Sequence, residues 1–293
     1  MIRPYQTEDE TAFIQILKEP NGHYLSEEKL DFTGFQEVYV LEHEHQLIGF
    51  SAIEVHEKLS QIICYVSPSM RRNGFGTQLF EHGKKCLEAL DPNTIWLFFR
   101  NDVGESASFY QKRGAAAWYS YHYMEAPQQT YKNMNALPFD EVIPYAESYF
   151  DTYLEKRADA FLTINQMIDS RPHDERDRRA EIKKWTENNL ENIWLFLEKG
   201  LLVGSLTMYD GFFDELFVSK THQNKGVGSA IVNWGLNRCF EKQFIPSLCV
   251  VTGNHAAINL YEKNGFIVKQ TLEMNRLFSQ NKEPDLRGPI GGA

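Results

Sequence analysis

The sequence lacks cysteine pairs, long apolar runs and an excess of basic residues. Its four cysteines, Cys64, Cys86, Cys239 and Cys249, lie singly within apolar runs, without the spacing of a disulfide framework or a zinc site. We interpret them as reduced core residues, and we expect no metal and a cytoplasmic location. No apolar stretch reaches the roughly 18 residues that a membrane-spanning helix needs, and residues 1–10 are too acidic for a signal peptide.

The charge of the chain is acidic, with a formal net charge of −10. This balance argues against nucleic acid as the main partner, because binding a phosphate backbone requires a basic face. The basic cluster at residues 171–184 also contains Asp174, Glu175, Asp177 and Glu181, so we interpret it as a solvated helix face. The 293 residues fit two domains, each of about 130 to 160 residues and able to bury a core.

One pattern occurs twice: residues 66–76 read VSPSMRRNGFG and residues 218–228 read VSKTHQNKGVG. In each copy a β-rich apolar run stops at a polar turn with two glycines, and the following apolar residues have helical spacing. Alternate glycines let backbone N–H groups converge at the start of a helix, where the macrodipole adds about half a positive charge. Both junctions therefore predict a phosphate site. The alternative is that the glycines only permit a tight turn.

Two familiar phosphate loops are excluded. A dinucleotide-binding turn would have a third glycine where Leu79 and Ile231 stand, and neither copy continues as the Gly-Lys-Ser/Thr of a Walker loop. The pattern resembles instead the Arg/Gln-x-x-Gly-x-Gly/Ala loop of the GNAT acyltransferase superfamily, which holds the pyrophosphate of acetyl-coenzyme A. Both copies match it, as Arg71-x-x-Gly74-x-Gly76 and as Gln223-x-x-Gly226-x-Gly228.

The resemblance extends to the elements around each loop. A pair of strands precedes it, at residues 38–41 and 47–53 in the first copy and at residues 193–197 and 202–206 in the second. An amphipathic helix, a strand and a short helix ending at glycine follow it. The resemblance implies an α+β (mixed α/β) fold with two tandem GNAT-like domains. Each would have a central mixed, largely antiparallel sheet, flanked by helices and containing a splayed parallel strand pair.

We place the domain boundary after residue 126, which gives domains 1–126 and 127–293. The linker at residues 126–130 is polar and contains proline, and it follows the presumed last strand of the first copy at residues 118–124.

The two domains are expected to open differently. Residues 2–4 with Asp9 resemble the family's opening strand and turn, whereas residues 131–145 show no such pattern. Residues 146–190 read as helices that cover one side of an acceptor site, interrupted at Arg171 and Pro172.

The resemblance implies that both copies bind acetyl-coenzyme A as co-substrate. In the second copy the implied cofactor-binding residues are Val218, Gln223, Asn224, Lys225, Gly226, Val227, Gly228, Ser229 and Asn254. In the first copy they are Val66, Arg71, Arg72, Asn73, Gly74, Phe75, Gly76, Thr77 and Tyr110.

Acetyl transfer from a thioester to an amine requires a neutral amine, although an alkylammonium has a pKa near 10.4. The resemblance implies direct transfer, with protonation of the departing sulfur by Tyr261 in the second copy and Tyr110 in the first. A core aromatic is the alternative for either tyrosine.

For the general base we favour Glu215 over Asp214, because strand alternation sends one of the two to the acceptor face. An ordinary hydrogen-bonded carboxylate is the alternative, and His222 and His255 are further candidates.

The short helices of the two copies differ. Asn254 can cap the second one and matches the family's Asn-x-x-Ala-x-x-x-Tyr pattern. In the first copy Asp102 is the cap candidate, with Glu105 completing a capping box. A carboxylate there would face an anionic cofactor. We therefore expect the second copy to be the catalytic one, although the loop of the first has two arginines.

The sequence thus predicts an N-acetyltransferase that moves an acetyl group from acetyl-coenzyme A to a primary amine, of a small molecule in our first interpretation. Two alternatives stay open. One is a coenzyme A-binding sensor or scaffold with one or both acceptor sites inactive, and the other is a transferase that acts on a protein N-terminus or lysine. We expect a monomer or homodimer.

Overall fold

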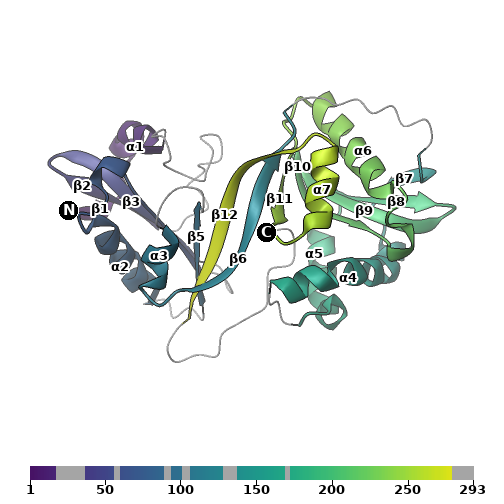
Figure 1. Ribbon diagram of the computed structural model, residues 1–293, viewed down its shortest axis with the longest axis horizontal. Coiled ribbons are helices and arrows are strands. Elements are labelled where there is room, and N and C mark those ends of the chain that lie inside the picture. The colour runs from purple at the N-terminus through teal and green to yellow at the C-terminus, as the bar shows by residue number, and fades with distance from the viewer. Residues whose placement is uncertain are drawn as a thin grey trace. The chain divides into compact units, whose positions relative to one another are not determined.

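A computed structural model describes residues 1–17, 37–55, 60–88, 94–100, 106–127, 137–168 and 172–278 of the chain. They form two compact units (Figure 1). Unit 1 comprises Met1–Ser120 and a segment that begins at Thr271, and unit 2 comprises Tyr121–Gln270.

Unit 1 is a sheet with helices on both faces. Its strands are β1 (Ile2–Pro4), β2 (Glu37–His43), β3 (Gln46–Val55), β4 (Ser60–Val66), β5 (Thr94–Arg100) and part of β12 (Ile267–Phe278), paired in that order. Its helices are η1 (Thr7–Asp9), α1 (Glu10–Leu17), η4 (Pro68–Met70), α2 (Phe75–Glu88) and α3 (Ser106–Gln111). The apolar side of α1 packs on Val40 and Phe50, and α2 packs on the opposite face through Phe80 and Leu87.

Unit 2 repeats this order. Its strands, from the outer edge inward, are β7 (Glu141–Pro144), β8 (Ile193–Glu198), β9 (Leu201–Tyr209), β10 (Phe212–Val218), β11 (Ser247–Val251) and part of β6 (Ala116–Glu125). Its helices are η5 (Glu147–Tyr149), α4 (Phe150–Met167), η6 (Glu175–Arg178), α5 (Arg179–Asn188), η7 (Lys220–His222), α6 (Val227–Glu241) and α7 (His255–Lys263). Helix α4 packs on one face, where Tyr153 meets Phe217, and α6 packs on the other.

One parallel strand pair interrupts the antiparallel order in each unit. Strands β4 and β5 pair from Ser60 with Ile95 to Ile62 with Leu97, and β10 and β11 pair only at Phe212 with Ser247 and Phe213 with Leu248. Both ladders end before the strands do, so the following residues of each pair are splayed. The mixed α/β sheets confirm the predicted fold class.

The last strand of each copy differs from the expectation. Residues 121–125 of β6 pair with β11 in unit 2, and residues 272–278 of β12 pair with β5 in unit 1. Each copy therefore gives its final strand to the sheet of the other. The contiguous division at residue 126 differs from these units because strand pairing is made by backbone groups, which two duplicated sheet edges offer alike. Residues 128–130 of the expected linker lie outside the described residues.

The opening of unit 2 corrects a second expectation. Residues 141–144 form β7, which pairs antiparallel with β8 as β1 pairs with β2. Tyr145 follows Pro144 as Tyr5 follows Pro4, and a short 3₁₀ helix and an α-helix come next in both units. The opening strand is thus present, but Ile143 and Tyr149 stand where unit 1 has Arg3 and Asp9, so the polar pattern that marked the first opening is missing from the second.

Candidate active site

The two strand-to-helix loops fold in the same way with different side chains. Arg71 donates from Nε to the Val66 carbonyl at 2.9 Å, and Gln223 donates from Nε2 to the Val218 carbonyl at 3.1 Å. The arginine or glutamine of the motif therefore closes each loop onto the last residue of its strand.

The first glycine of each loop is required by its backbone. Gly74 has φ of +84° and Gly226 has φ of +82°, and a Cβ built on either would meet no atom within 4 Å. Positive φ, and not lack of space, therefore selects glycine at these positions. Gln78 N donates to the Gly74 carbonyl at 3.1 Å, and Ala230 N donates to the Gly226 carbonyl at 3.0 Å. The N–H groups of the first turn are left without helical partners, as a phosphate site requires.

The second glycine lies against the short tyrosine helix in each unit. A Cβ at Gly228 would lie 3.2 Å from Leu260 of α7, which is a tight contact, so glycine favours the close approach of α6 and α7. A Cβ at Gly76 would lie 3.5 Å from the Phe109 ring of α3, an ordinary contact, so packing does not require glycine at this position.

The other predicted cofactor residues divide by exposure. Exposed side chains at the loops are those of Arg71, Arg72, Asn73, Gln223, Asn224 and Lys225. Val66 and Val227 are buried in the apolar cores, and Val218 and Phe75 pack against them. The buried Val66 and Val227 can therefore offer only backbone groups to a ligand.

The two tyrosines hold equivalent places. Phe266 N donates to the Tyr261 carbonyl at 3.1 Å, and Ala115 N donates to the Tyr110 carbonyl at 3.2 Å. Asn254 Oδ1 accepts from Ala257 N at 3.2 Å, which confirms the predicted cap of α7. The corresponding Asp102 and Glu105 of the first copy lie outside the described residues.

Tyr261 is a buried residue of α7. Its side chain lies beside Phe266, and burial raises its pKa to about 12. The hydroxyl is protonated at neutral pH, as that of an ordinary tyrosine is, and the raised pKa makes it a weaker acid. Tyr110 is also buried, among the rings of Phe80 and Phe99.

A β-bulge in unit 2 changes which face Glu215 occupies. The register of β10 against β9 shifts between Phe213 and Glu215, at Asp214. Phe213 packs in the core on the α6 side, whereas Phe217 packs on the α4 side. The extra residue at the bulge places Glu215 on the α4 side with Phe217. Simple alternation would have kept Phe213, Glu215 and Phe217 on one face.

Glu215 belongs to a buried ionic cluster that the sequence analysis missed. Arg157 of α4 donates from Nε to Glu215 Oε2 at 3.0 Å and from Nη2 to Glu215 Oε1. Its Nη1 pairs with Glu175 of η6. Arg157 is 2% exposed, Glu215 5% and Glu175 7%. A signal for Arg157 exists, because it continues the apolar stripe of α4 formed by Phe150, Tyr153, Leu154 and Ala158.

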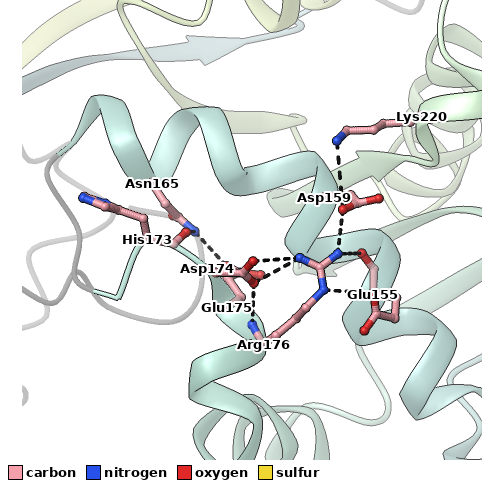
Figure 2. Close-up of polar contacts among 8 residues, drawn as sticks. All are labelled: Glu155, Asp159, Asn165, His173, Asp174, Glu175, Arg176 and Lys220. Carbon is pink, nitrogen blue, oxygen red and sulfur yellow. Dashed lines mark hydrogen bonds and ion pairs between the residues drawn. The ribbon is translucent and has the colours of Figure 1, made fainter.

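A second, more exposed cluster connects α4, η6 and the start of the loop (Figure 2). Arg176 pairs with Asp159 at 2.6 Å, with Asp174 at 2.9 Å and with Glu155 at 2.9 Å. Asp159 also lies 4.0 Å from Nζ of Lys220 in η7. The hydrogen bond from Arg176 lowers the pKa of Asp159, so this carboxylate stays ionised beside the lysine. Other basic residues of this stretch are also paired: Arg178 with Glu181, Arg179 with Asp151 and Lys183 with Glu147. The solvated-face interpretation holds only in part, because Glu175 is buried against Arg157.

The further base candidates are His222, the last residue of η7, and His255. His222 Nε2 is 3.4 Å from Glu198, and its Nδ1 is 2.9 Å from Thr221 Oγ1. His255 is the first residue of α7. In the described part of the chain, no three His, Cys, Asp or Glu side chains are grouped to hold a metal ion. The same residues include no helix long and apolar enough to span a membrane.

Two family matches and several solved structures agree with this geometry. The "Acetyltransferase (GNAT) domain" matches residues 34–114, and the "Acetyltransferase (GNAT) family" matches residues 154–266. A GCN5-related N-acetyltransferase from Sphaerobacter thermophilus is 17% identical with a TM-score of 0.71, over 99% of this chain and 96% of that one. No curated protein sequence matches the chain.

Tandem architecture is found among the structural neighbours. A tandem GNAT protein from the clavulanic acid biosynthesis pathway is 12% identical with a TM-score of 0.60, over 97% of this chain and 99% of that one. An acetyltransferase from the GNAT family of Colwellia psychrerythraea is 9% identical with a TM-score of 0.53, over 95% and 100%. At these identities the likeness concerns the fold.

The fold and the paired loops define an acyltransferase. The chain belongs to the GNAT acetyltransferase family and carries two of its domains in tandem. The family generally uses acetyl-coenzyme A as donor.

Proposed function

We propose that the protein transfers an acetyl group from acetyl-coenzyme A to a primary amine of a small molecule, in a ternary complex on unit 2. The observation that carries this assignment is the bulge at Asp214, close to where β10 leaves β11. The bulge turns Glu215 to the α4 side of the sheet, two residues beyond Phe213, the last residue of β10 that pairs with β11. A carboxylate beside the splayed strand ends can take a proton from an acceptor amine. In unit 1 the ladder of β3 and β4 runs from Gly49 with Val66 to Val55 with Ser60 without a shift.

The donor is held by the loop of unit 2 in this proposal. The first-turn N–H groups of α6 and the side chains of Gln223 and Lys225 receive the pyrophosphate. Asn254, at the N-terminus of α7, is close enough in the chain to Tyr261 to line the same side of the donor.

The chemical step joins the amine nitrogen to the thioester carbon and breaks the carbon–sulfur bond. Tyr261 gives its proton to the departing thiolate and regains one from the site afterwards. Glu215 is our candidate for the group that takes the ammonium proton. Arg157, Glu175 and Glu215 together carry one excess negative charge, so one added proton brings these three groups to neutrality.

For unit 1 we propose donor binding without turnover. The residue of β4 that corresponds to Glu215 is Ile63, which is 2% exposed in an apolar cluster with Phe13 and Phe50. No base stands at that position, while the donor loop is complete.

The test measures binding and turnover separately. Calorimetric titration of acetyl-coenzyme A into the full chain, Gly74→Glu and Gly226→Glu gives the number of sites. Each substitution places bulk and negative charge in one loop. An amine panel assayed for released thiol should then show turnover that Gly226→Glu abolishes and Gly74→Glu retains. Binding without turnover of any small amine or peptide would favour a sensor, and turnover of peptides alone would make the acceptor a protein.

A further inference from the structure

One contact joins α3 to the start of α2 in unit 1. Arg113, the residue before the glycine at the end of α3, donates from Nη2 to Thr77 Oγ1. Its Nη1 donates to the Phe109 carbonyl at 2.7 Å, and its guanidinium carbon lies 3.7 Å from the centre of the Phe109 ring. The arginine is thus fixed between the two helices.

Unit 2 makes the same two contacts with a different side chain. Asn264, again the residue before the glycine, donates from Nδ2 to Ser229 Oγ at 3.3 Å and to the Leu260 carbonyl at 2.7 Å. Asn233 donates to Asn264 Oδ1 at 3.1 Å and holds the amide in place. Because two diverged copies keep the contact, its geometry serves a purpose common to both loops.

The hydroxyl is the feature that both contacts orient. Thr77 is the third residue of α2 and Ser229 is the third residue of α6, so each belongs to the first turn that forms the proposed phosphate site. A hydroxyl oxygen that accepts a hydrogen bond from a fixed donor keeps its own hydrogen for another acceptor. The pyrophosphate of bound coenzyme A offers oxygens that can accept this hydrogen bond.

The two contacts differ in charge. Arg113 makes no ion pair with a carboxylate within the described ranges, so it adds positive charge behind the loop that already carries Arg71 and Arg72. Asn264 is neutral, and it is 1% exposed. Unit 2 has Lys225 in its loop, and its other nearby cation, Lys220, lies beside Asp159.

We propose that Arg113 and Asn264 are positioning residues that hold the hydroxyls of Thr77 and Ser229 toward the donor, and that Arg113 makes unit 1 the tighter coenzyme A site. This inference rests on the proposed function. It gives unit 1 a retained donor and unit 2 an exchangeable one, as turnover requires.

The experiment uses full chains with one donor site blocked. Gly226→Glu leaves unit 1, and Gly74→Glu leaves unit 2; because both glycines have positive φ, thermal unfolding first checks that each variant is folded. The Kd of coenzyme A is measured by calorimetry at low and high salt. Arg113→Asn should weaken binding to unit 1 about 10-fold at low salt and reduce its salt dependence, because a charge is lost. Asn264→Arg should strengthen binding to unit 2, a gain that structural damage does not produce.

The control is Lys112→Ala, which removes the adjacent exposed charge and leaves the contact to Thr77 intact. Equal effects of Arg113→Asn and Lys112→Ala would overturn the charge assignment. Arg113→Leu, which loses the contact as well as the charge, should bind coenzyme A more weakly than Arg113→Asn, and in a Thr77→Val background this difference should vanish, since only the orientation of the hydroxyl separates the two variants. A difference that persists without the hydroxyl would overturn the positioning role. Absence of coenzyme A binding in both single-site chains would instead overturn the proposed function, and this inference with it.

Discussion

At the residue scale, different side chains make equivalent hydrogen bonds in the two units. Arg71 and Gln223 close their loops onto the strand carbonyl, and Arg113 and Asn264 orient the hydroxyls of the first helical turn. These side chains differ in charge between the units, whereas the backbone carbonyls that they contact are equivalent.

Tyr261 provides the first test at this scale. It is protonated at neutral pH and so holds a proton that can pass to the departing thiolate, although burial, which raises its pKa to about 12, makes it a weaker acid than an exposed tyrosine. Tyr261→Phe should lower kcat by about 10- to 100-fold and leave the KM for acetyl-coenzyme A nearly unchanged. Tyr110→Phe is the matched control and should not affect kcat. A full kcat in Tyr261→Phe would remove the tyrosine from the reaction.

Asp9 provides a test of pH-dependent stability. Arg3 donates to both of its oxygens at 2.7 Å, and this pairing lowers the pKa of Asp9 below its ordinary value of 3.8. A lowered pKa means that ionised Asp9 stabilises the fold above its unfolded pKa, and that this contribution disappears as pH falls through the folded pKa. Asp9→Asn should therefore cost about 1 to 2 kcal/mol at neutral pH. Thermal unfolding of both proteins should show the difference shrinking as the pH falls below the ordinary pKa of 3.8, and a difference that stays constant into strong acid would contradict the pairing.

At the element scale, the bulge in β10 and the packing of α4 determine the surroundings of Glu215 in unit 2. The bulge turns Glu215 toward α4, where Arg157 forms ion pairs with both Glu215 and Glu175. A strand and two helical segments are thereby joined through one guanidinium.

Removal of that guanidinium should be costly. Arg157→Met would leave two buried carboxylates unpaired and should destabilise the protein by about 3 to 5 kcal/mol in urea unfolding. Arg157→Met with Glu175→Gln and Glu215→Gln should recover most of this loss, because no buried charge remains. Failure of the triple variant to recover would show that the cluster stabilises by more than charge compensation.

At the scale of the whole molecule, the exchanged strands make each unit depend on a distant part of the chain. Arg276 of β12 lies with its guanidinium carbon 4.3 Å from the ring centre of Trp118 in unit 1, and Leu277 completes the core around Tyr110. The C-terminal strand is therefore a component of the N-terminal unit.

A truncation separates this arrangement from contiguous domains. A chain that ends after Gln270 should lose hydrogen-exchange protection in β4, β5 and α2 of unit 1 and keep it in β8, β9 and α6 of unit 2. A chain that ends after Phe278 keeps β12 and is the control. Loss of protection in unit 2 with unit 1 intact would support the contiguous division at residue 126 instead.

The sequence by itself determined the repeated local structure. The glycines at 74, 76, 226 and 228, the apolar periodicity around them and the cap at Asn254 specified both loops and the helices they begin, because these depend on backbone freedom and local hydrogen bonds. The family and the tyrosine helices followed from that local pattern.

Tertiary structure alone decided which sheet each final strand joins, which face Glu215 occupies and what pairs with it. Two copies of one sheet edge offer the same backbone groups to β6 and β12, so local sequence does not select the partner. A bulge shifts facing by one residue without a distinct sequence signal at Asp214. The contacts of Glu215 with Arg157 and of Thr77 with Arg113 join residues far apart in the chain, and only packing brings such side chains together.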